Sequence, residues 1–552
     1  MMNNIFTFLI TLFLCLHQVV AHEGDDHSHC EQALLKAPIT IHSSGRDEDM
    51  LPELEVAAKK LTQLAKELGF ATPPHIMSFV PAVQMNVLAS LGRHSAPHWV
   101  DGENILRNLG SASNILEFVT RGCDACRSYF SDTNSLKHQI SIIMHVLGHN
   151  DVSSNSNFHK SVYTDSMGYS KKFAEQVQWL YEHYDHDEVS LYVQWLYSLE
   201  YMQNFVFAGF DPPNFFKPTT DNITRVEHLG TKNKAEKTYK SNKHPQRPSA
   251  NILQALVYNL PSNVPTWKVE LLDTFEKSRR YYSGNIATKI MNEGWATFSQ
   301  YLLARHSDYT TDDDIAQFGG LLYGVAFPKL DNPYYLGLQL WWHLWEQFKN
   351  KPEMSKLSAK EIDKLFVSRA HEIISTNDDF SFIDVAIDQK WIDKMKFSLV
   401  RPVDSKDKID RSKIAKPPSN DAKLMVALSR HRERIVRYIQ RKVASRQLIF
   451  PHVLLEDFNW MNNGIIKLRH EMIEDVPLKM DSSFLSLFVL SQLLEKPIAL
   501  EAQYDVNYIF IVEPTGKVKV HIKDDKAKLD HRNPLGAINQ QLTHVGQKIV
   551  DE

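Results

Sequence analysis

Apolar side chains recur at helical spacing through most of the chain between residues 51 and 402. The run from Leu51 to Leu68 keeps its apolar residues on one face and is followed by Gly69, a residue typical of helix ends. Few runs in this region alternate as a half-buried strand would. The pattern therefore predicts a mainly α fold with a large helical domain over 51–402, with further helices over 135–147, 171–184, 189–207, 286–303 and 336–348.

The pattern changes after residue 402. Residues 403–422 contain almost no apolar side chains and include a pair of prolines, which is typical of a linker. Beyond them a helical pattern is followed by short strand-like runs, and residues 514–516 separate two of these runs as a hairpin turn would. We therefore expect a small α+β domain over 423–552 with a disordered tail, with helices over 423–441 and 482–494 and strands over 453–456, 464–468, 498–503, 508–513 and 517–522.

The N-terminus has the pattern of a secretory signal peptide. Residues 5–21 form one apolar stretch, and small residues before Ala21 predict cleavage after it, although no Lys or Arg precedes the stretch. The stretch is short for a membrane span and contains His17 and Gln18. We therefore expect an exported protein, periplasmic or extracellular, with no transmembrane span after cleavage.

The expected mature chain begins HEGDDHSHC, and residues 22–50 are polar. We interpret them as a His-rich flexible arm, and the sharper alternative is an arm that scavenges metal ions. Farther along, Cys123 and Cys126 form a C-x-x-C pair that could be a local disulfide or a redox pair. A single such pair is too weak a signal to indicate an oxidoreductase.

Length and charge narrow the class of protein. A chain of 552 residues is too long for one compact core, so two or more domains are expected. With 62 basic and 66 acidic residues the net charge is -4, which gives no global basis for nucleic-acid binding.

Two segments carry candidate chemistry. His145 and His149 are four residues apart, so on a helix their rings share one face and could bind one metal ion. Glu293 lies in the apolar run TKIMNEGWA beside Gly294, which would let a backbone or a ligand come close. Two histidines from one helix and a glutamate from a later one are the ligands of a His₂Glu zinc site. The plainer alternatives are histidines bonded to backbone carbonyls and a solvated pair between Lys289 and Glu293.

The expected site has no obvious general base. Zinc peptidases with H-E-x-x-H carry the base directly after the first histidine, where this chain has Val146. Gly148 and the polar residues after it also predict that the helix ends there, which would expose His149 at a turn. By residue type the remaining catalytic candidates are weak, and they are Asp151, Glu276, Tyr281 and Tyr282.

Several strings, taken whole, resemble the SpoVR family, the stage V sporulation protein R family. They occur in the family's order over roughly residues 55–525, and NEGWA after TKIM is the most specific of them. The strings are MHVLGHND (144–151), TKIMNEGWATF (288–298), DNPYYLGLQLW (331–341), RAHEI with NDDFSFI (369–383), IIKLRHEMIEDVPLKM (465–480) and PIALEAQYDVNYIFIVEPTG (497–516).

The resemblance implies a bacterial protein linked to spore cortex formation where spores are made, with no firmly assigned reaction. Its paired histidines and NEGWA are similar to a gluzincin arrangement, in which His145, His149 and Glu293 would be the zinc ligands. The chain departs from the family pattern at Gln300, where a histidine is often found, and in its apparent export signal. It is identified as a divergent exported member.

Three functions remain open from the sequence. The first is a zinc-dependent, hydrolase-like protein of the bacterial envelope that acts on an amide or peptide bond, for example in peptidoglycan. The second is a non-catalytic scaffold or regulator that binds envelope proteins or peptidoglycan fragments and keeps a structural metal or polar site. The third is an exported metal-binding protein that uses its N-terminal arm.

Overall fold

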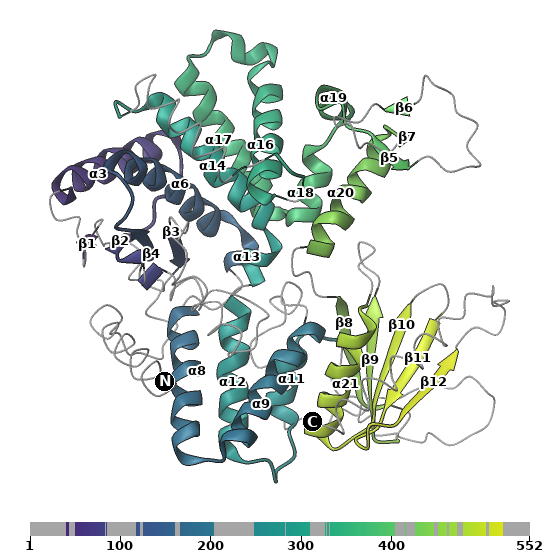
Figure 1. Ribbon diagram of the computed structural model, residues 1–552. Helices are drawn as coiled ribbons and strands as arrows, with labels where there is room; N and C mark the ends of the chain where they lie inside the picture. The colour runs from purple at the N-terminus through teal and green to yellow at the C-terminus, as the bar shows by residue number, and fades with distance from the viewer. Residues whose placement is uncertain are drawn as a thin grey trace, which may run out of the picture.

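A computed structural model describes residues 40–43, 50–82, 84–85, 117–121, 125–160, 166–203, 248–281, 283–309, 326, 328–330, 332–402, 414–415, 425–446, 451–460, 463–471, 478–503 and 507–522. The predicted signal peptide, most of the predicted arm and the tail after residue 522 lie outside these residues. Figure 1 shows two bodies, one mainly helical and the other with helices beside a five-stranded sheet. The mainly helical fold with a small C-terminal sheet domain is thus confirmed. No helix among the described residues is long and apolar enough to cross a membrane.

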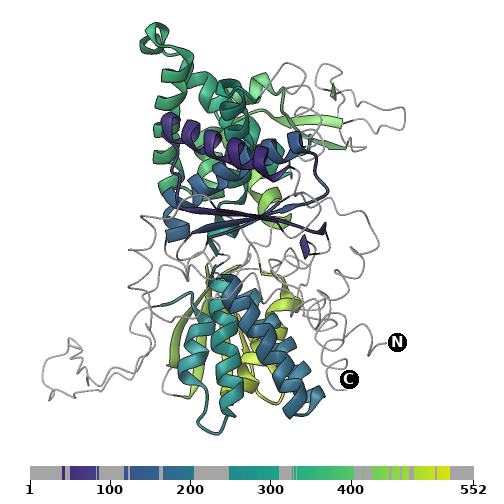
Figure 2. The same cartoon turned by 90° about the vertical axis from the view of Figure 1, so that its left-hand side faces the viewer.

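The first body packs long helices on a four-stranded sheet, and Figure 2 shows that sheet as a thin layer under α3. The strands lie in the order β1-β2-β4-β3, and only β3 runs antiparallel to its neighbour. The helices are α3 (Leu51–Leu68), α6 (Leu136–Asn155), α7 (Asn157–Lys160), α13 (Ser283–Ala287), α14 (Lys289–His306), α16 (Pro333–Lys349), α17 (Ala359–Thr376), α18 (Asp379–Ala386), α19 (Gln389–Lys394) and α20 (Arg432–Arg446), with the 3₁₀ turn η4 (Pro352–Lys356). The strands are β1 (Thr40–Ser43), β2 (His75–Val80), β3 (Glu117–Arg121) and β4 (Cys126–Ser131).

The sequence pattern does not predict this four-stranded sheet. Its strands are short, and β2 is buried at every position except Ile76, so no alternation marks it. The sheet lies inside the region predicted as helical, and β1 lies inside the segment predicted as a flexible arm.

In the described part of the second body, five helices pack against the C-terminal sheet, whose order is β12-β11-β10-β9-β8. β9 and β10 are parallel and are joined through α21, whereas the other neighbours are antiparallel. The predicted hairpin turn at 514–516 is confirmed, with Gly516 at φ +79°. The elements are α8 (Ser166–His183), α9 (His186–Leu199), η3 (Glu200–Met202), α11 (Ile252–Asn259), α12 (Thr266–Tyr281), α21 (Met480–Leu494), β8 (His452–Trp460), β9 (Ile465–Glu471), β10 (Ile498–Gln503), β11 (Asn507–Val512) and β12 (Val518–Ile522).

Both bodies use segments from either side of the predicted linker. Helices α8 to α12 share their apolar core with the C-terminal sheet, whereas α20, which follows the linker, packs in the first body. A small third sheet joins β5 (Leu399–Pro402), β7 (Met425–Ser429) and β6 (Ile414–Ala415). Strand β6 lies within the predicted linker.

Two predicted helix ends had different outcomes. Gly69 ends α3 in the left-handed conformation, at φ +94°, as predicted. The predicted end of α6 near Gly148 is wrong, because α6 continues to Asn155. Gly148 lies within the helix where α14 crosses it, and a Cβ there would be 2.6 Å from the Ala296 Cα. The His149 side chain is consequently 11% exposed and does not lie at an open turn.

His75 on β2 predicts an acid-sensitive fold. Its ring is buried, with Nε2 2.7 Å from Ser128 Oγ and Nδ1 3.2 Å from Asn150 Nδ2, and burial lowers its pKa to about 3. The unfolded chain, with an ordinary His pKa, therefore binds more protons between pH 6.5 and 3, so stability falls as the pH falls through that range. Between pH 6.5 and 5.0 the loss is about 2 kcal/mol for this residue.

Urea unfolding of the wild type and His75→Gln at both pH values measures this loss. The variant is expected to lose about 2 kcal/mol less than the wild type between the two pH values. Equal losses in the two proteins would contradict the assignment. His159 is a useful internal reference, because burial also lowers its pKa to about 3 and it titrates in both proteins.

Candidate metal centre

His145 and His149 lie in the middle of α6 and face α14. Their ring centroids are 4.7 Å apart and the rings are nearly perpendicular, at 84°. Around them α6 is otherwise mostly apolar and buried. Burial, followed by the neighbouring His149, holds the pKa of His145 well below its usual range, and a hydrogen bond with Gln300 opposes this. His145 is therefore a neutral imidazole with a lone pair to offer.

Glu293 on α14 meets both histidines. Its Oε2 atom lies 3.4 Å from His149 Nε2 and 3.9 Å from His145 Nε2. That oxygen is buried and has no hydrogen-bond partner among the described residues. The three residues predicted as metal ligands thus come together. The plainer alternative, a solvated pair between Lys289 and Glu293, is not among the ion pairs of the described residues.

Glu117 is a fourth member that sequence reasoning missed. It lies at the start of β3, and its Oε1 atom is 3.9 Å from His145 Nε2. Burial, and secondarily the charge of Glu293, raise its pKa to about 7. The only signal in the sequence is a lone acidic residue within the apolar run ILEFV, which no motif accompanies.

The donor set suits a divalent cation. Ligand atoms of Glu117, His145 and His149 lie within 4.8 Å of one another. Atoms that are each about 2.0–2.2 Å from a tetrahedral zinc ion are about 3.3–3.6 Å apart, close to the separations between Glu293 and the histidines. A buried carboxylate oxygen without a donor is costly, and a cation at this position would satisfy it. The cluster could therefore hold a metal ion.

Tyr334, at the start of α16, closes one side of the cluster. Its ring stacks on His145, with centroids 6.2 Å apart and an interplanar angle of 19°. Burial, then the charges of Glu293 and Glu117, hold the pKa of the phenol well above its usual range. Tyr334 is thus a proton-bearing donor beside two carboxylates. The sequence indicated its segment only through the DNPYY string.

Two of the four catalytic candidates predicted by residue type, Asp151 and Glu276, are described, and both are bonded to other groups. Asp151 is fully buried and accepts hydrogen bonds from the Ala71 N–H (2.7 Å), Trp295 Nε1 (2.8 Å) and His371 Nε2 (2.8 Å). It therefore joins α6 to α14 and α17. Neither Asp151 nor Glu276, the other candidate that the structure describes, is available as a base at the cluster.

The second of these candidates, Glu276, lies in α12 and forms a buried ion pair with Arg280, 2.6 Å long. Tyr281 is the last residue of α12, and its side chain is outside the described part of the structure, as is the whole of Tyr282. Cys126 is buried, and burial raises the pKa of its thiol to about 11. Its predicted partner Cys123 is also outside the described residues, so their pairing stays a prediction.

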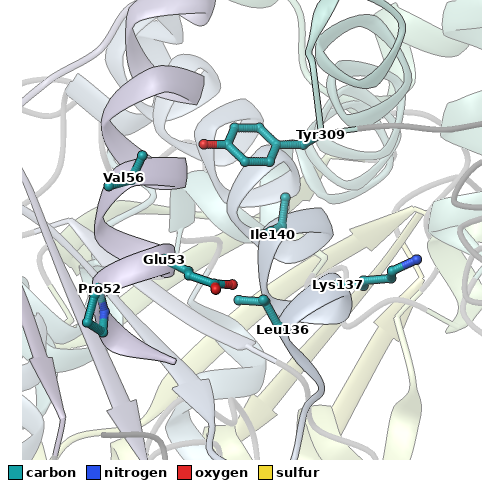
Figure 3. Close-up of a pocket in the computed structure, with 7 residues that line it drawn as sticks. All are labelled: Pro52, Glu53, Val56, Leu136, Lys137, Ile140 and Tyr309. Carbon is teal, nitrogen blue, oxygen red and sulfur yellow. The ribbon is translucent and has the colours of Figure 1, made fainter. Parts of the chain in front are cut away.

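A groove on the first body lies apart from the cluster. It has a volume of about 560 Å³ and is open to one side between α3, the N-terminal end of α6 and Tyr309 (Figure 3). None of its lining residues belongs to the cluster, and these residues are Pro52, Glu53, Val56, Leu136, Lys137, Ile140 and Tyr309.

Comparisons with known proteins agree with the strings found in the sequence. The model of the "SpoVR like protein" family matches residues 48–417. The uncharacterized protein YcgB of Escherichia coli (strain K12) is 24% identical over 339 residues, which is 54% of this chain and 65% of YcgB. The chain thus matches slightly less than two thirds of that relative's length. No solved structure matches.

Proposed function

Because the chain belongs to the SpoVR-like family, we propose that its buried cluster is the metal centre of a hydrolase and that the metal is zinc. The observation that carries the proposal is the Glu293 oxygen, buried and without a donor, within 4 Å of two imidazole nitrogens. Two histidines and one glutamate hold the zinc ion at the catalytic centres of known metallopeptidases. His145, His149 and Glu293 would be its ligands.

Each remaining polar side chain of the cluster has a role in this proposal. Bound zinc would supply a Lewis acid and a water molecule of lowered pKa. Glu117 lies on β3, whereas the three ligands lie on α6 and α14, and it faces the His145 nitrogen that Glu293 also faces. It would accept the proton of that water. The Tyr334 hydroxyl would donate a hydrogen bond to the oxygen that becomes negative during attack. Glu117 would thus replace the base that H-E-x-x-H proteins carry at the position of Val146.

The substrate class and the location form a further part of the proposal. An amide or peptide bond is the bond that a centre with two histidines, one carboxylate and a separate base most commonly cleaves. The signal-peptide pattern supports action in the bacterial envelope, where peptidoglycan peptides offer such bonds. The family's name, which refers to sporulation, is consistent with work on the cell wall.

A scaffold or regulator with a structural metal is the second candidate. It is favoured by the presence of two carboxylates and two imidazoles at one place, because four protein ligands would close the coordination of zinc. Structural sites are closed in this way, whereas catalytic sites keep one position open. The two candidates therefore differ in whether Glu117 binds the metal or lies beside it.

Metal content tests the centre itself. Elemental mass spectrometry is expected to find about one equivalent more zinc in the wild-type chain than in a His145→Ala/His149→Ala variant. Both proteins carry the His-rich N-terminal segment, so any metal bound there cancels in the comparison. Equal zinc content in the two proteins would refute the metal centre. A positive result justifies a screen of peptides and peptidoglycan fragments for hydrolysis that the variant lacks.

A further inference from the structure

Each histidine of the cluster has a carboxamide of α14 beside it. His149 Nδ1 lies 2.9 Å from Asn292 Oδ1, and Gln300 lies within reach of the His145 ring. The Gln300 amide nitrogen in turn donates to the hydroxyl of Ser141, one turn before His145 on α6. The helix that supplies Glu293 thus also supplies the partners of both imidazoles.

These bonds select one protonation pattern in each ring. An amide oxygen can only accept a hydrogen bond, so Nδ1 of His149 carries the proton and Nε2 is left with a lone pair that faces Glu293. The nitrogen of Gln300 donates one of its two hydrogens to Ser141, and its oxygen is the acceptor that Gln300 offers to a ring N–H of His145. The Nε2 atom of His145 faces Glu117 and Glu293, and Nδ1 is therefore the nitrogen that remains for Gln300.

The charge of the cluster explains why amides suit these two positions. Carboxylates commonly orient metal-binding histidines and add negative charge to the site. Here Glu117 and Glu293 already bring two carboxylates, which one divalent cation would neutralise. Amides orient the rings without adding a third or fourth negative charge to a buried place, where such charge is costly.

We propose that Asn292 and Gln300 are positioning residues, which hold Nε2 of His149 and His145 unprotonated and aimed at one cation. The inference rests on the proposed metal centre and assigns the control of its affinity to two side chains that do not touch the metal. If the two amides acted only as links between α6 and α14, their loss would change the stability of the fold and leave the affinity for metal unchanged. Metal affinity therefore distinguishes the two roles.

The test uses Gln300→Met and Asn292→Leu, which keep approximate size and remove the acceptor. Zn²⁺ affinity of the full chain is measured by competition with a chromophoric chelator, and the absorption spectrum of bound Co²⁺ reports the ligand geometry. Each variant is expected to bind Zn²⁺ about 10- to 100-fold more weakly than the wild type. Asn292→Asp keeps an acceptor oxygen at a partly exposed position and is expected to bind within a few-fold of the wild type.

Gln347→Met is the matched control. Gln347 Nε2 lies 2.7 Å from His343 Nε2, so this variant also removes an amide from a histidine, but away from the cluster. Its Zn²⁺ affinity is expected to be unchanged. Asn292 is partly exposed, so its variant remains informative if Gln300→Met does not fold.

Three outcomes would overturn the inference, and they are distinguishable from one another. Wild-type affinity and an unchanged Co²⁺ spectrum in both variants would mean that the amides only connect α6 and α14. The proposed metal centre would be unaffected by that result. A loss of affinity in Gln347→Met as large as in the other two variants would show that the effect is not specific to the cluster. Absence of Zn²⁺ and Co²⁺ binding in the wild type would overturn both the inference and the proposed function.

Discussion

Glu293→Gln is expected to lose the bound zinc, whereas Glu117→Gln is expected to keep it and lose hydrolysis. Glu293 Oε2 faces both imidazoles at 3.4 and 3.9 Å, and an amide there removes the charge that would hold the cation. We expect zinc affinity to fall by more than about 100-fold, which exceeds the loss typical of a residue that only holds a metal ligand in place. Glu117 Oε1 faces only one imidazole at comparable distance, as a group placed to take a proton from bound water would.

The two carboxylates can be separated by measuring zinc content and turnover on the same preparations. For Glu117→Gln we expect a full equivalent of zinc and a decrease in turnover of about 10²- to 10⁴-fold, the range of a general base. Zinc loss in Glu117→Gln as severe as in Glu293→Gln would make Glu117 a ligand. That result would favour the closed, structural site of the second candidate function.

Gly294→Ala is expected to destabilise the fold by about 3 kcal/mol or more. Gly294 on α14 lies against Gly337 on α16, and a Cβ at residue 294 would collide with the backbone of residue 337. Backbone cannot rotate away as a flexible side chain can, so the two helices would have to separate. The higher helix propensity of alanine, worth about 1 kcal/mol, offsets only part of this cost. Urea unfolding measures the change.

A second glycine gives the matched control for that measurement. Gly464 has φ +70°, and a Cβ added to it would meet no atom within 4 Å, so Gly464→Ala tests backbone conformation without a collision. We expect it to cost roughly 1–2 kcal/mol, the penalty of a left-handed residue. A smaller loss for Gly294→Ala than for Gly464→Ala would mean that α14 and α16 are not held by the close contact of Gly294 and Gly337. Zinc content of Gly294→Ala should fall as well, because the same helix carries Glu293.

The sequence predicted the parts of the fold that depend on local spacing. The helix over 51–68 and its glycine end, the helices around 145 and 293, and the hairpin at 514–516 follow from apolar periodicity and turn residues, which act within a few positions. The types and spacing of the paired histidines also indicated a metal site. The strings of the family indicated which family the chain belongs to.

Contacts between distant segments were outside the reach of such patterns. Glu117 carries no motif, and only the pairing of β3 with β4 brings it to α6. Asp151 had the residue type of a base, but Trp295 and His371 occupy its carboxylate. Gly148 had the residue type of a helix end, but α14 packs against it and the helix continues.

By itself the sequence determined the helices, the small C-terminal sheet and the presence of two histidines on one helical face. Only the tertiary structure decided that Glu293 meets those histidines, that Glu117 and Tyr334 join them, and that two amides orient them. Local sequence patterns reflect only the interactions between residues that are close together along the chain. The chemistry of a site depends on which side chains from distant elements share one small, buried volume.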